Sequence, residues 1–277
     1  MEITKYELYD RIHLQSEMVE KLKELSEQID LSLLESNLEK MMDRKTAKQA
    51  YLQLKEFFQD DEGHMKMLYC QLECARRLFR QYQEKQISEK IFTDTMKCFT
   101  RFIKECEEKN GQMFFDRGWW TYRQISMSLF RIGALEYEFK EYGGENVIAL
   151  HIPSDADLSG ESVDASLGQA KHFFQIYYDD YKYEKYICDS WLLSPALRGA
   201  LSRDSNILLF QDRFTILEED QEDKEYIEWL FQVPKDTDYH KLPEKTSLQR
   251  RIKNRIIHGE KVGSALGYFD RIGDHSY

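Results

Sequence analysis

The sequence predicts an all-helical N-terminal domain followed by a domain of the α/β (α+β) class, in which helices flank a largely antiparallel or mixed sheet. No proline occurs before Pro153 and only one glycine precedes Gly111, so the first part of the chain lacks residues that end helices. Its apolar residues follow a helical period, whereas segments beyond Trp119 alternate with a period of two. From this change we expect two domains, residues 1–117 and 118–277.

The first domain is expected to consist of helices joined by short links. A helical spacing of apolar residues marks four segments: Leu22 to Ile29, Tyr51 to Phe58, Leu68 to Phe79 and Ile91 to Cys106. Ser88 stands where an N-cap is expected, in a capping box that lacks its glutamate. Asn110-Gly111 is typical of a left-handed C-terminal cap.

The second domain is expected to begin with a β-hairpin. Residues 134–139 alternate in polarity, Gly143-Gly144 forms a turn, and residues 146–152 form a more apolar strand. The elements expected after this hairpin are a helix over 163–178, a strand over 186–191 and a helix opened by Ser194-Pro195. Further strands are expected at 207–210, 214–217 and 226–231, then a basic helix over 247–257. Three glycines are expected in turns: Gly259, Gly263 and Gly267.

Composition excludes several classes of partner. The formal net charge of −11 opposes binding to phosphate backbones and to anionic membrane surfaces, so we expect neither nucleic acid nor a membrane as partner. No apolar run approaches the ~18 residues that span a bilayer, and the N-terminus lacks a secretory apolar segment. Five scattered cysteines without a CxxC pair favour a reducing compartment, and we expect a cytoplasmic location.

The cysteines do not form a recognisable catalytic or metal centre. Cys70 and Cys74 share a helical face with His64 nearby, but no second pair completes a zinc site, so core packing is favoured and no metal is expected. Cys188 adjoins Asp189, a neighbour that raises a thiol pKa, and it too is expected in the core. The sequence contains no Gly-x-Ser-x-Gly elbow and no phosphate-binding P-loop.

Three polar positions in the expected strands are candidates for chemistry. Asp189 interrupts an apolar strand, where it either hydrogen-bonds a loop or takes part in catalysis. His151 ends the strand NVIALHI, where it is either a satisfied core histidine or a group exposed at the sheet edge. Glu136 and Glu138 share one face of their strand, which either faces solvent or supplies a general base.

Four segments carry a resemblance to a known family: RGWWTYRQISMSLFRIGALEYEF, LHIPSDADLSGESVDASLGQAKHFF, ICDSWLLSPAL and DSNILLFQDRF. They resemble bacterial acyltransferases that pair a helical N-acyltransferase N-terminal domain with a GNAT-like C-terminal domain. ICDSWLLSP is the most specific piece, and the match covers most of the second half. The resemblance implies a GNAT-like mixed sheet and acyl transfer from acyl-CoA or acetyl-CoA to an amine, on a small molecule or a peptide.

In the family this chain resembles, a loop of the form Gln/Arg-x-x-Gly-x-Gly/Ala holds the CoA pyrophosphate with its backbone amides. The corresponding segment here, residues 153–166, has one glycine and no glutamine or arginine. It carries four acidic residues instead: Asp155, Asp157, Glu161 and Asp164. The resemblance therefore places cofactor binding on Ser159, Gly160 and Ser162, with Asp164 as an alternative helix N-cap that occupies the same place.

Two hypotheses follow. In the first, the protein is an N-acyltransferase in which His151 or Glu138 is the base and Asp189 or a serine is the proton donor, since residues 188–194 contain no tyrosine. In the second, it is a catalytically inactive GNAT-like scaffold that serves as a binding or regulatory module. The aromatic-rich sequence is compatible with a homodimer in either case.

Overall fold

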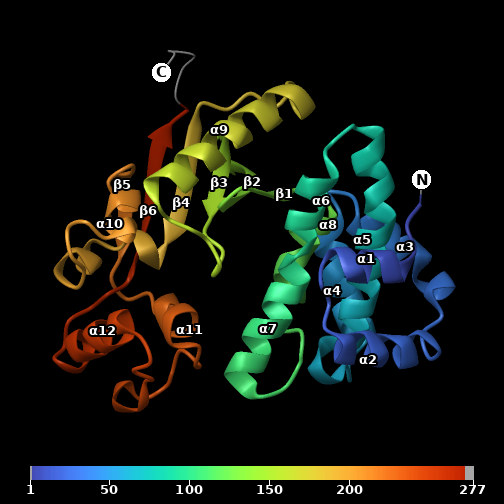
Figure 1. Cartoon of the computed structure of the whole chain (residues 1–277), viewed down its shortest axis with the longest axis horizontal. Helices are drawn as coiled ribbons and strands as arrows, with labels where there is room; N and C mark the ends of the chain where they lie inside the picture. Colours follow the sequence, from blue (N-terminus) through green and yellow to red (C-terminus); the bar gives the residue numbers. More distant parts are fainter. Residues whose placement is uncertain (1, 272–277) are drawn as a thin grey trace. The chain divides into compact units, whose positions relative to one another are not determined.

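The structure, a computed structural model, describes residues 2–271 and divides between Ile132 and Gly133 into two compact units (Figure 1). This division lies beyond the expected boundary at residue 117. The reason is α8 (Gly118–Ile125), which is tied to the first unit through Gln71. The Gln71 side chain donates to the Gly118 carbonyl at 2.9 Å and accepts from the Thr121 hydroxyl at 2.5 Å.

The first unit is helical, as predicted, and ends in the short strand β1 (Leu129–Ile132). Its other helices are α1 (Lys5–Arg11), α2 (Ser16–Ser26), η1 (Leu31–Leu34), α3 (Glu35–Met41), α4 (Ala47–Phe57), η2 (Glu62–His64), α5 (Met65–Glu84), α6 (Glu89–Met96) and α7 (Cys98–Asn110), where η marks a 3₁₀ helix. Both predicted caps are confirmed. The Ser88 hydroxyl accepts from the Ile91 N–H, and Gly111 ends α7 with φ of 70°.

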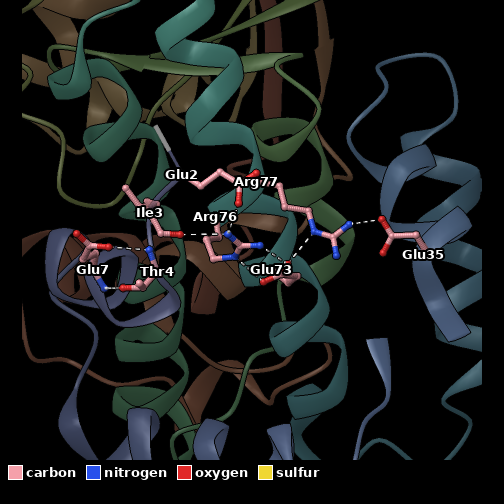
Figure 2. Close-up of polar contacts among 8 residues, drawn as sticks. All are labelled: Glu2, Ile3, Thr4, Glu7, Glu35, Glu73, Arg76 and Arg77. Carbon is pink, nitrogen blue, oxygen red and sulfur yellow. Dashed lines mark hydrogen bonds and ion pairs between the residues drawn. The ribbon is translucent and has the colours of Figure 1, made fainter. Parts of the chain in front are cut away.

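A network of charged side chains on α5 holds the N-terminal segment and α3 (Figure 2). Glu73, whose side chain is only 13% exposed, accepts two hydrogen bonds from Arg76 and one from Arg77, all at 2.7–2.8 Å. Arg76 also donates to the Ile3 carbonyl at 3.1 Å, and Arg77 donates to Glu35 at 2.5 Å. Burial acts to raise the pKa of Glu73, but the bonds from Arg76 and Arg77 outweigh it and lower that pKa.

Replacing Glu73 by glutamine should lower the free energy of unfolding by about 2 kcal/mol at neutral pH, because two partly buried guanidinium groups lose their shared carboxylate. The folded-state pKa of Glu73 lies below its unfolded value. Its contribution is therefore complete above the unfolded pKa of about 4.5 and is lost as pH falls through the folded pKa. Urea unfolding of the parent chain and of Glu73→Gln measures the difference in their free energies of unfolding, which should be smaller at pH 3 than at pH 7.

The matched control is Glu84→Gln, on the same helix. Glu84 pairs with Arg80 in an exposed ion pair, with side chains 59% and 63% exposed, so the loss should be small. Equal losses for Glu73→Gln and Glu84→Gln at pH 7 would contradict the role given to the network.

The described strands of the second unit form a mixed sheet in the order β2-β3-β4-β6-β5. The second unit supplies β2 (Leu135–Tyr142), β3 (Glu145–His151), β4 (Lys185–Ser190), β5 (Thr215–Asp220) and β6 (Ser264–Asp270). The predicted hairpin is confirmed: β2 and β3 pair antiparallel around Gly143 and Gly144, which both have positive φ. Of the pairs formed by β2 to β6, only β3–β4 is parallel.

The second unit combines this sheet with helices, as predicted. They are α9 (Gly160–Tyr177), η3 (Trp191–Leu193), η4 (Pro195–Gly199), α10 (Asn206–Gln211), α11 (Glu225–Phe231), η5 (Tyr239–Lys241) and α12 (Ser247–Ile257). α9 covers one face of the sheet, where Phe174 packs edge-to-face on Tyr137 and Phe139 (Figure 1). Among the described residues, no helix is both long and apolar enough to cross a bilayer.

Three predicted elements are wrong. Residues 207–210 and 226–231, predicted as strands, are helical in α10 and α11. Short apolar runs fit either state, and here Tyr226, Ile227 and Phe231 are buried in a separate small core with α12. Gly267, predicted in a turn, lies within β6, where an added Cβ would come within 3.0 Å of Phe214.

Candidate functional site

The parallel strands β3 and β4 stop pairing before either strand ends. Within the described residues their register contains only Ile148 opposite Tyr186 and Ala149 opposite Ile187. β3 nevertheless continues to His151 on its pairing with β2, and β4 continues to Ser190 on its pairing with β6. Within the described residues, the carboxyl ends of these two strands therefore lie beyond their shared ladder.

His151 and Glu138 meet beside this opening. Tyr137 and Phe139 point toward α9, so the alternation of the strand places Glu138 on the opposite face, together with His151 of β3. The His151 Nε2 atom lies 2.8 Å from the Glu138 Oε2 atom, and the two side chains are 23% and 18% exposed. The cross-strand register thus joins two of the predicted site residues into one pair. Glu136, the other glutamate of this face, is buried.

Asp189 stands on the other side of the opening, on the strand position before the end of β4. It pairs with Leu266 of β6 in the ladder and is exposed to solvent. Partial loss of hydration raises the pKa of the Asp189 carboxyl; Lys140 opposes the shift. Three carboxylates add to it: Asp223, Glu218 and Asp220. This is the direction that a proton donor requires.

The N-terminus of α9 carries the predicted cofactor residues, and Asp157 engages two of them. Ser159, not Asp164, is the N-cap, and its hydroxyl accepts from the Ser162 N–H at 3.4 Å. The Asp157 carboxylate accepts from the Ser159 N–H and hydroxyl, both at 2.9 Å, and from the Ser162 hydroxyl at 2.5 Å. These bonds lower the pKa of Asp157. The Asp157 carboxylate thus engages three donors of Ser159 and Ser162 at the start of α9.

Arg213 is a basic residue beside the start of α9 that the sequence alone did not predict. Arg213, from the turn between α10 and β5, donates to Asp164 of α9 at 2.5 Å. A Cβ added at Gly160 would lie 3.9 Å from the Arg213 guanidinium, so the cation stands at the first turn of α9. Arg213 lies in the segment DSNILLFQDRF, far from Gly160 in sequence, and only the fold brings the two together.

The cysteines lie in the core. Cys70 and Cys74 are buried in α5, and burial raises the pKa of both thiols. Cys188 is buried in β4 with its pKa likewise raised by burial. Residues 2–271 contain no group of three or more His, Cys, Asp or Glu side chains that would hold a metal ion.

Comparison with known families accounts for both units. Residues 129–269 match the GNAT-like C-terminal domain, and residues 4–127 match the N-acyltransferase N-terminal domain. The chain belongs to the family of proteins with a GNAT-like C-terminal domain. The family resemblance drawn from the sequence is thereby confirmed, and the match over residues 4–127 extends it to the helical half of this GNAT-like protein. No curated protein matches its sequence.

Solved structures resemble the GNAT-like chain over nearly its whole length. An acyltransferase in complex with decanoyl-CoA shares 20% identity at a TM-score of 0.78, covering 96% of this chain and 86% of the other. A mutant acyltransferase in complex with octanoyl-CoA shares 19% at 0.79, covering 96% and 87%. A complex of acyltransferase with decanoyl-CoA and teicoplanin shares 18% at 0.72, covering 98% and 100%. At these identities the likeness establishes the fold.

Proposed function

We propose that this protein is an acyl-CoA-dependent N-acyltransferase that acylates an amine on a small molecule or a peptide. The observation that carries the proposal is the early end of the β3–β4 pairing. It leaves the carboxyl ends of two parallel strands outside their shared ladder, and His151, Glu138 and Asp189 lie near these ends in sequence and register. Pantetheine contains two amide groups that suit such a strand edge. Acyltransferases of this fold crystallised with acyl-CoA support the same cofactor.

In the proposed reaction His151 is the general base and Glu138 is its positioning residue. With Glu138 accepting the Nε2–H, the imidazole carries its basic lone pair on Nδ1. The acceptor amine attacks the thioester carbonyl, so a C–N bond forms and the C–S bond breaks. The amine proton passes to His151, and the departing thiolate takes a proton from Asp189, which yields an amide and CoA.

The pyrophosphate of CoA is proposed to bind at the first turn of α9. The backbone amides that follow Ser159 and the dipole of an 18-residue helix favour an anion there, and Arg213 adds a positive charge. Binding requires the Asp157 carboxylate to give up its bonds to Ser159 and Ser162. Asp157 is therefore expected to weaken CoA binding, and Arg213 to strengthen it.

Replacing Asp157 by asparagine should tighten CoA binding roughly threefold to tenfold, because a like charge leaves the pyrophosphate site while the amide oxygen still accepts from Ser159. Replacing Arg213 by glutamine should weaken binding by a similar factor. Isothermal titration with CoA at fixed ionic strength measures both changes. The control is Asp179→Asn, an exposed residue beyond the C-terminal end of α9. Weaker binding by Asp157→Asn would contradict this placement of the pyrophosphate.

The decisive test of the function is thermal stabilisation by CoA, acetyl-CoA and longer acyl-CoAs. At ~100 times the dissociation constant, a specific ligand adds about 2.7 kcal/mol to the free energy of unfolding. The stabilisation should disappear in Gly160→Asp, which puts a carboxylate at the first turn of α9. An absence of stabilisation by every thioester would overturn the proposal.

The hydrogen bonds that Asp157 accepts from Ser159 and Ser162 favour one alternative: a GNAT-like scaffold that has lost CoA binding and acts as a binding or regulatory module. In that case Asp157 permanently satisfies the N-terminus of α9. Asp157→Asn would then change stability without creating affinity for CoA. The titrations above therefore separate the two functions.

A cytoplasmic location also belongs to the proposal. The five cysteines all lie within the described residues, are buried and form no disulfide, which suits a reducing compartment. Fractionation of cells that express the protein tests this location, and recovery outside the cytoplasmic fraction would contradict it.

A further inference from the structure

The helical unit contains a groove that the proposed reaction does not use. We call it the α2–α4 groove and define it by Leu25 and Ile29 from the end of α2 and the turn after it, Leu33 and Leu34 of η1, and Phe57 and Phe58 at the end of α4. Its volume is about 500 Å³, in the range of sites that bind a few side chains or a small ligand. All the residues that line it belong to the first unit.

The apolar surface of the groove is unusually exposed. Leu33 is 79% exposed and Phe57 is 65% exposed, the highest values among the large hydrophobic residues of the described chain. Phe57 and Phe58 pack edge-to-face at 5.2 Å, so the rings present a joined apolar surface and not isolated side chains. Two such exposed residues on one groove are typical of a surface that a partner covers.

The charges that line the groove identify the partner chemistry. They are the carboxylates of Asp30 and Asp60 and the ammonium group of Lys66. Lys66 is engaged locally, since its Nζ donates to the Asp60 carbonyl at 3.3 Å and lies 6.0 Å from the Phe58 ring centroid. Asp30 accepts from the Ser32 N–H and hydroxyl at 2.9 and 2.7 Å, and both Asp30 and Asp60 are exposed. Two carboxylates against one ammonium group leave the rim with one net negative charge around an apolar floor.

We propose that the α2–α4 groove binds a basic amphipathic segment of a partner protein. Its apolar side chains would cover Leu33 and Phe57, while its lysines or arginines would face Asp30 and Asp60. An apolar floor and an acidic rim together select a segment that has apolar side chains on one face and basic side chains on the adjacent face. An acidic segment of the same hydrophobicity would be repelled.

The test uses two labelled peptides of equal length that place leucine on one helical face and either lysine or glutamate on the other. Fluorescence anisotropy with the full chain should show binding of the leucine/lysine peptide and not of the leucine/glutamate peptide. The double variant Leu33→Ser with Phe57→Ser should weaken binding about tenfold or more, since hot-spot side chains at an interface are lost. Serine adds no charge, so the change reports the apolar contact.

Two control variants separate the groove from general attraction to an acidic surface. Leu209→Ser removes a 47% exposed leucine from α10, and binding should be unchanged. Asp60→Asn should weaken binding severalfold, whereas Asp179→Asn should not. The proposal is overturned if the double serine variant binds as the parent chain does, if Leu209→Ser weakens binding equally, or if the leucine/glutamate peptide binds as tightly. Because CoA is absent from these measurements, their outcome is independent of the acyltransferase proposal.

Discussion

Replacing His151 by alanine should lower the rate of acyl transfer about 10²- to 10⁴-fold, the usual range for loss of a general base. The imidazole lies 2.8 Å from Glu138 at the carboxyl end of β3, so the lost group is both positioned and close to the proposed thioester. Steady-state kinetics with a chromogenic thiol reagent would measure the release of CoA. The loss should fall on kcat, because the imidazole acts in the transition state.

Three comparisons make this result specific. Glu138→Gln should reduce kcat less than His151→Ala, since glutamine preserves a hydrogen bond but not the charge. His172→Ala, an exposed position on α9, should leave the rate unchanged. Thermal stabilisation by CoA should survive in His151→Ala. A variant that binds CoA and retains the parental rate would remove His151 from the proposed mechanism.

Replacing Gly263 by alanine should lower the free energy of unfolding by about 3–5 kcal/mol, the largest stability change expected from a single methyl group in this chain. Gly263 has φ of +69°, a conformation that side chains rarely adopt. An added Cβ would also overlap the Asp220 carbonyl oxygen and lie 2.7 Å from the Gln221 Cα. Both are backbone atoms at the end of β5, so relief requires a shift of the strand.

Gly259→Ala supplies the matched control. Gly259 has φ of +86°, but an added Cβ there meets nothing within 4 Å. Only the conformational cost of about 1–2 kcal/mol is then expected. Chemical denaturation of both variants separates the backbone conformation from the steric overlap. Equal losses at the two positions would show that the contact with β5 contributes nothing.

Elements with local signals could be predicted from the sequence. Ser88 and Gly111 were identified as caps because capping depends on residues a few positions apart. The β2–β3 hairpin followed from alternating polarity around Gly143-Gly144, which again is local. The family, too, is carried by contiguous strings of sequence, and the matches over residues 4–127 and 129–269 confirm it.

Elements whose state depends on distant neighbours were missed. The segments that became α10 and α11 are too short for periodicity to distinguish a helix from a strand. The state of α11 is set by a small core shared with α12. Gly267 within β6 and Gly263 just before it both suggested turns, yet β6 pairs with both β4 and β5, and those pairings determine its conformation.

For the candidate site, the chemical groups could be predicted from the sequence: a histidine and a glutamate in a hairpin, an aspartate in the next strand, and serines at the start of a helix. Which of these groups contact one another depends on the fold. The antiparallel register of β2 and β3 brought Glu138 to His151, and the turn before β5 brought Arg213 to α9. Distances across a sheet and between remote segments depend on packing of the whole unit, and no local pattern encodes them.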